Sequence, residues 1–78
     1  MLTAPKVLDQ YYLESRCMLL EIAAMLDRFD RANSSEGNGK AMLDQRLELI
    51  YQALHLLAER PTDPNRAERL LNLFSDPA

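Results

Sequence analysis

The sequence predicts an all-α fold, in which a long helical hairpin is followed by a short third helix. Three observations lead to this prediction. Apolar residues recur at steps of three and four over most of the chain. A turn-forming stretch at 33–39 separates two such segments, and Pro61 and Pro64 set off a third. Because 78 residues are enough for one domain at most, we predict a single helical domain over residues 1–78.

The first predicted helix covers residues 4–32. Thr3 is a suitable N-cap residue, and Pro5 is tolerated in the first turn, where backbone amides have no partner within the helix. Apolar residues then recur without a helix breaker until about Ala32. Residues 33–39 contain turn formers and both glycines of the chain, and are therefore predicted to form the connection to the next helix.

The second predicted helix covers residues 40–60 and is ended by the proline that follows. The third covers residues 64–74, with Asp63 as its cap and Pro64 in its first turn. Residues 75–78 are expected to fray. The second helix has a main apolar face, whose residues repeat at steps of four and three. This face is formed by Leu43, Leu47, Ile50, Leu54 and Leu57.

The first helix is unusual because apolar residues occupy two opposite sides of it. On a helical wheel of 100° per residue, one set of residues lies within roughly 40° of a common direction. A second set points roughly 160–220° away from Ile22. We call these sets the first face and the second stripe. The first face consists of Leu8, Tyr11, Ser15, Met18, Ile22, Leu26 and Phe29, and the second stripe of Leu13, Cys17, Leu20 and Ala24.

The second helix also carries apolar residues away from its main face. Met42, Leu49 and Leu56 repeat every seven residues, some 100–140° from that face. A compact three-helix monomer needs one broad apolar face on each helix, whereas opposed stripes fit a helix that lies between two layers. The third helix could cover part of this surface by folding back, and a second copy the rest. We therefore expect a homo-oligomer, most simply a two-fold dimer with a four-helix core, and the alternative is a three-helix monomer.

One carboxylate, Glu21, belongs to the predicted interface between copies. Its neighbours from Cys17 to Leu26 are otherwise apolar, and a charge removed from water needs a partner. We expect an ion pair with Arg16, Arg28 or Arg46 of the same chain or of a partner chain. The complete predicted interface consists of Leu13, Cys17, Leu20, Glu21, Ala24, Met42, Leu49 and Leu56.

Composition argues against several classes of protein. The chain is 47% apolar and 27% charged, as in folded globular proteins. Its net charge of -3 is spread evenly, with acidic and basic residues interleaved, so no basic patch is available for nucleic acid. The most apolar window, 17–26, is about half as long as a membrane span. Asp9, Glu14 and Arg16 interrupt the apolar run that a signal peptide would need. We expect a cytoplasmic protein that binds neither nucleic acid nor a membrane.

No residue pattern predicts a catalytic, cofactor or metal site in one chain. No spacing of Ser, Cys, His and Asp favours a nucleophilic site over chance. His55 lies near Glu48 and Glu59, but a glutamine stands where the Glu-x-x-His pattern of carboxylate-bridged bundles needs a glutamate. At a symmetric interface each residue appears twice. The candidate ligands of a metal there would be Glu14, Glu21 and His55.

These observations favour a non-enzymatic helical module for interactions between proteins, which acts as a scaffold, adaptor or regulatory subunit. Its first expected partner is another copy of the chain, followed by a different protein. The alternative is a metal- or small-ligand-binding bundle with a carboxylate site at a symmetric interface, and a third possibility is an inactive subunit of a heteromeric enzyme. The charge substitution Leu20→Glu on the second stripe is expected to dissociate the oligomer and to leave much of the helix content.

Overall fold

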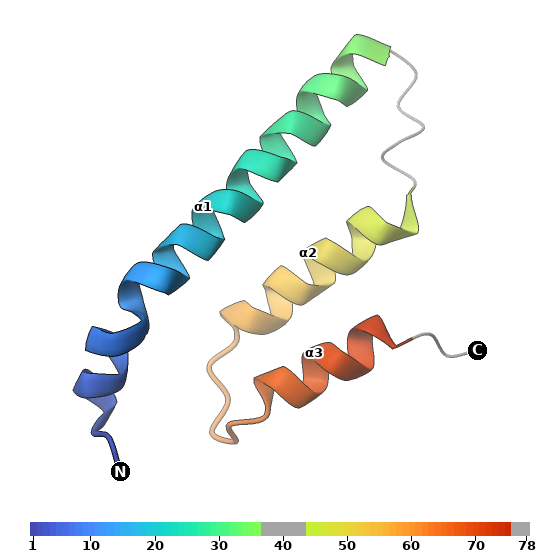
Figure 1. Ribbon diagram of the computed structural model, residues 1–78. Coiled ribbons are helices and arrows are strands. Elements are labelled where there is room, and N and C mark those ends of the chain that lie inside the picture. Colours follow the sequence, from blue (N-terminus) through green and yellow to red (C-terminus); the bar gives the residue numbers. More distant parts are fainter. Residues whose placement is uncertain (37–43, 76–78) are drawn as a thin grey trace. The chain divides into compact units, whose positions relative to one another are not determined.

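The chain is all-helical, as its sequence predicts. The computed structural model describes residues 1–36 and 44–75, and this part of the chain contains no strand. The predicted order of one long helix and two shorter ones is confirmed (Figure 1). The three helices are α1 (Ala4–Glu36), α2 (Gln45–Ala58) and α3 (Arg66–Phe74).

The chain divides into two compact units. Met1–Asn38 contains α1, and Gly39–Ala78 contains α2 and α3, which pack against each other. Because α1 is the one helix described in its unit, it has no second helix there on which to bury its apolar sides. α1 carries most of the large exposed apolar side chains.

α1 begins with the predicted cap and extends beyond its predicted end. The hydroxyl oxygen of Thr3 accepts a hydrogen bond from the Lys6 amide at 3.4 Å, and its carbonyl oxygen accepts one from the Val7 amide at 3.0 Å. The helix continues to Glu36 rather than ending at residue 32. Asparagine and serine cost only a few tenths of a kcal/mol in a helix, so the segment 33–35 does not stop it.

α2 begins after an aspartate cap. The Oδ1 atom of Asp44 accepts a hydrogen bond from the Arg46 amide at 2.9 Å and one from its Nε at 3.1 Å, and Oδ2 accepts one from Nη2 at 2.7 Å. Hydrogen bonds from the Arg46 side chain, and then from its backbone, lower the pKa of Asp44 to about 2. The predicted start at residue 40 lies in 37–43, outside the described residues.

α2 ends at Ala58, before the predicted end at residue 60. The C-cap residue Glu59 has an extended backbone, with φ -69° and ψ 150°, and its amide donates to the carbonyl of Leu56 at 3.2 Å. Arg60 precedes Pro61, and a residue before proline is disfavoured in the helical region. Pro61 therefore disfavours a helical conformation at Arg60, and α2 has already ended at Ala58.

α3 begins two residues later than predicted, and its cap is not Asp63. The carbonyl of Asp63 accepts a hydrogen bond from the Asn65 amide at 3.0 Å, so Pro64 lies in a turn before the helix. Asn65 is the N-cap, and its carbonyl accepts a hydrogen bond from the Arg69 amide at 3.0 Å. The predicted end at Phe74 agrees with the structure, and residues 76–78 of the predicted frayed end lie outside the described residues.

Few side chains of the described residues are buried. Leu47 is 8% exposed and Ala53 is 9% exposed, both on α2, and no polar or charged residue in the described ranges is buried. A core of this size contributes little to stability, because the hydrophobic term scales with the apolar area removed from water. No helix in the described part of the chain is both long and apolar enough to cross a membrane.

Candidate interaction surface

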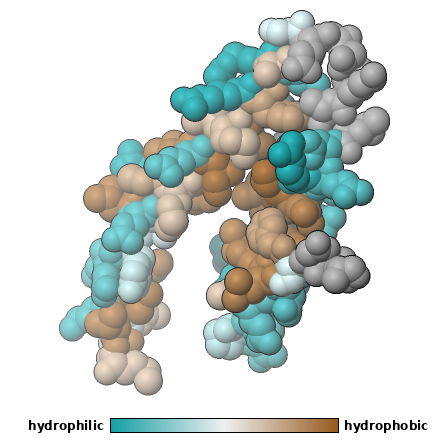
Figure 2. Space-filling view, turned by 45° about the vertical axis from the view of Figure 1, so that its right-hand side comes forward, coloured by the Kyte–Doolittle hydropathy of each residue, from teal (hydrophilic) through white to brown (hydrophobic). Residues whose placement is uncertain are grey.

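The first face of α1 is largely accessible over its N-terminal half. Leu8 is 66% exposed, and Tyr11 and Met18 are also exposed. Further along the same face, Ile22 and Phe29 are half-buried. Figure 2 shows apolar side chains at several places along α1, interrupted by hydrophilic ones.

The second stripe of α1 is accessible along its whole length. Leu13 is 62% exposed and Leu20 is 58% exposed, and Cys17 and Ala24 are also exposed. Between the two sides lies a shallow, mostly apolar hollow of about 420 Å³, built by α1 alone. It is lined by Tyr12, Ser15, Arg16, Leu19 and Leu20. Apolar surface is therefore present on both predicted sides of this helix and in the sector between them.

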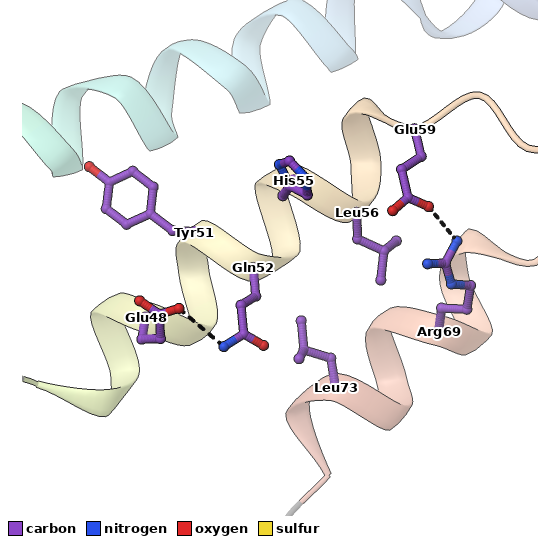
Figure 3. Close-up of a pocket in the computed structure, with 8 residues that line it drawn as sticks. All are labelled: Glu48, Tyr51, Gln52, His55, Leu56, Glu59, Arg69 and Leu73. Atoms are coloured by element: carbon purple, nitrogen blue, oxygen red, sulfur yellow. Dashed lines mark hydrogen bonds and ion pairs between the residues drawn. The ribbon is translucent and has the colours of Figure 1, made fainter.

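α2 and α3 enclose an open groove of about 500 Å³. Leu56 of α2 and Leu73 of α3 point toward each other at its floor (Figure 3). On the wall formed by α2, Gln52 donates a hydrogen bond to Glu48 at 3.3 Å. The other lining residues are Tyr51, His55, Glu59 and Arg69. The groove combines a narrow apolar floor with polar walls that stay in contact with water.

Two arginines of α3 bind the end of α2 through Glu59. Nη1 of Arg69 lies 2.9 Å from Oε2 of the Glu59 carboxylate (Figure 3). Nη2 of Arg66 donates to the Glu59 carbonyl oxygen at 2.9 Å, and so satisfies a backbone acceptor at the helix end. Together these contacts fix how the chain leaves α2 and enters α3.

The additional apolar residues of α2 lie beside α3. Leu49 lines a second groove of about 450 Å³, together with Leu73 and Phe74 of α3. Leu49 and Leu56 are both half-buried. The third helix thus covers part of this surface by folding back, as the sequence suggested. Met42 lies outside the described residues, and a role of these positions in an interface between copies remains a prediction.

The three candidate metal ligands belong to different units of the chain. Glu14 and Glu21 are exposed on α1, whereas His55 is exposed on α2, near Glu48 and Glu59 in the groove. Within 1–36 and 44–75, no three His, Cys, Asp or Glu residues lie close enough to hold a metal ion.

Two features of the second unit were missing from the sequence prediction. The first is the binding of Glu59 by Arg66 and Arg69, which are 7 and 10 residues away across a turn. The second is an exposed apolar edge on α3, where Leu71 is 71% exposed and Phe74 is also exposed. The strong amphipathic pattern of residues 66–74 could have predicted this apolar edge. The contacts of Arg66 and Arg69 with Glu59 could not be predicted from the spacing rules for residues on one helix.

Comparisons of the chain with models of known protein families, with curated proteins and with solved structures found no match.

Proposed function

We propose that this protein is a non-enzymatic module for helix-mediated interaction, and that it assembles with further copies of itself. The observation that carries the proposal is the exposed apolar surface on opposite sides of α1. Large apolar side chains are exposed throughout its N-terminal half, and soluble monomers rarely leave patches larger than about 300–600 Å² in water. These exposed residues are Val7, Leu8, Tyr11, Tyr12, Leu13, Met18, Leu19 and Leu20.

The lengths of the helices support an additional partner. α1 has 33 residues and is about 50 Å long, at 1.5 Å per residue. α2 has 14 residues and α3 has 9, which corresponds to about 21 Å and 14 Å. Wherever the second unit lies, two helices of these lengths cannot cover both sides of α1 from end to end. A second copy supplies a helix of matching length, which makes self-assembly the simplest solution.

The second stripe provides the direct test. Leu20 is 58% exposed, and complete burial of a leucine contributes about 1.5–3 kcal/mol. Covering the exposed part in a two-fold dimer would therefore contribute about 2–3.5 kcal/mol for both copies, which corresponds to a roughly 30- to 400-fold change in Kd. Leu20→Glu removes this contribution and places a charge in the contact.

The matched control is Gln10→Glu, which adds the same charge to an exposed position of α1 outside both apolar sets. Light scattering coupled to size exclusion gives the mass of each variant, and circular dichroism gives its helix content. We expect Leu20→Glu to dissociate with its helices retained, and Gln10→Glu to keep the wild-type mass. Equal masses for all three proteins would exclude the second stripe as the contact.

A further inference from the structure

The first face of α1 has two edges of opposite character. One edge carries Glu14, Glu21 and Arg28, which recur every seven residues and are all exposed. The other edge carries Tyr12 and Leu19 at the same spacing, and Leu26, the residue of the first face nearest to this side, continues it, so that every step is apolar. We call them the polar edge and the apolar edge. They occupy the positions that flank the seam in a pair of packed helices, where side chains set the orientation of the partner.

Orientation decides which edges meet when two copies pack through this face. In a parallel pair, each edge of one helix lies against the opposite edge of the other, so Glu14 and Glu21 would lie beside Leu19 and Leu26 of the partner subunit. Carboxylates would then lose water without gaining a charged partner, which is unfavourable. In an antiparallel pair each edge meets its own kind, so polar groups face polar groups and apolar groups face apolar ones.

We infer that the first face of α1 binds α1 of a second copy in antiparallel orientation, with Glu21 of each chain paired with Arg28 of the partner subunit. This inference rests on the proposed self-assembly and adds a contact to it, because the second stripe tested by Leu20→Glu lies on the opposite side of α1 and is not part of this seam. In the inferred alignment of the two helices, the two-fold axis that relates the copies lies at the level between Ala23 and Ala24. Leu19 then lies opposite Leu26 of the partner subunit, and both ion pairs form by symmetry. The central layers of the seam pair Ile22 with Met25, an exposed residue that borders the first face, and Met18 with Phe29.

The charges select this register over its neighbour. Centred on Leu20, an antiparallel pair would overlap over more of the helix and would pair Glu14 with Arg28 of the partner subunit, but Glu21 would lie against Glu21 of the partner subunit at the centre of the contact. In the inferred register no like charges of the polar edge oppose each other. Moreover, within 1–36 and 44–75 neither Glu21 nor Arg28 makes an ion pair or a side-chain hydrogen bond. Both side chains are exposed.

Charge exchange in the full-length chain tests the inference. Arg28→Glu turns two attractive pairs into two repulsive ones, and Glu21→Arg does the same. At low salt each single variant should raise the dimer Kd by roughly tenfold or more, an effect that high salt should reduce. The double variant Glu21→Arg/Arg28→Glu restores opposite charges and should recover affinity near that of the wild type. Circular dichroism checks that every variant keeps its helix content.

The control variant is Glu14→Arg/Arg28→Glu. It also exchanges one glutamate and one arginine, but residue 14 does not lie opposite residue 28 of the partner subunit in this register. It should bind no more tightly than Arg28→Glu alone. Recovery in this variant, or a failure of the Glu21 and Arg28 exchange to recover affinity, would overturn the inferred pairing while leaving self-assembly intact. A wild-type chain that stays monomeric would overturn the proposed function and this inference together.

A second measurement reports orientation without altering charge. In a Cys17→Ser background, two variants are prepared, Met18→Cys and Phe29→Cys, and a short thiol cross-linker is added to each alone and to their mixture. Antiparallel packing should give cross-linked dimers in the mixture, because these positions share a layer. Efficient cross-linking of Met18→Cys with itself would instead indicate parallel helices and would refute the inference.

Discussion

The contact between Glu59 and Arg69 should stabilise the α2–α3 unit by a small, measurable amount. The two charged atoms lie 2.9 Å apart, and the side chains are 44% and 37% exposed. Because water reaches both groups, the pair should contribute only about 0.3–1 kcal/mol. We expect Glu59→Gln and Arg69→Met to show a coupling energy in this range in a double-mutant cycle.

The assay is urea unfolding followed by the helical circular dichroism signal, at one fixed protein concentration and at two salt concentrations. The coupling energy should fall at high salt, because exposed charges are screened. A second cycle, between Glu59→Gln and Arg66→Met, serves as the control. Arg66 binds the backbone carbonyl of Glu59, which the substitution retains, so this coupling should be near zero. Equal coupling in both cycles, or none for Arg69 at low salt, would refute the reasoning.

Two further predictions concern the helix caps. The Asp44 carboxyl has its pKa lowered to about 2, so its contribution to the start of α2 should be present above the ordinary value of 3.8 and be lost as pH falls through 2. An NMR titration should find this low value in the wild type and a higher one in Arg46→Ala; an unchanged value would show that Arg46 is not the cause. Thr3→Ala removes a long N-cap bond of 3.4 Å, so it should cost about 0.5 kcal/mol and reduce amide protection in the first turn of α1 roughly twofold. Uniform protection across the first turn in both proteins would contradict that role.

The fold class and the N-terminal cap of α1 were predictable because they depend on local chemistry. Periodic apolar residues and a threonine cap act within one helical turn, and both appear as expected. Helix ends were less predictable. Residues 33–35 are turn formers that a helix also tolerates at small cost, and α1 passes through them. Pro64 fits a helix start, but a turn closed by the Asp63 carbonyl takes precedence.

The candidate surfaces were predictable only as patterns on single helices. Periodicity identified the exposed second stripe of α1 and the additional apolar residues Leu49 and Leu56 on α2. It did not show which neighbour covers each of them, because that depends on how the chain turns after α2. The turn is held by Glu59 with Arg66 and Arg69, a contact between residues too distant in sequence for a helical spacing rule.

The most direct test of the proposed self-assembly is the solution mass of the wild-type chain, measured by light scattering over a roughly hundredfold range of concentration. The exposed apolar sides of α1 predict a mass of at least twice 8.9 kDa, falling toward that of one chain only on dilution. A constant mass of 8.9 kDa at every concentration would contradict self-assembly.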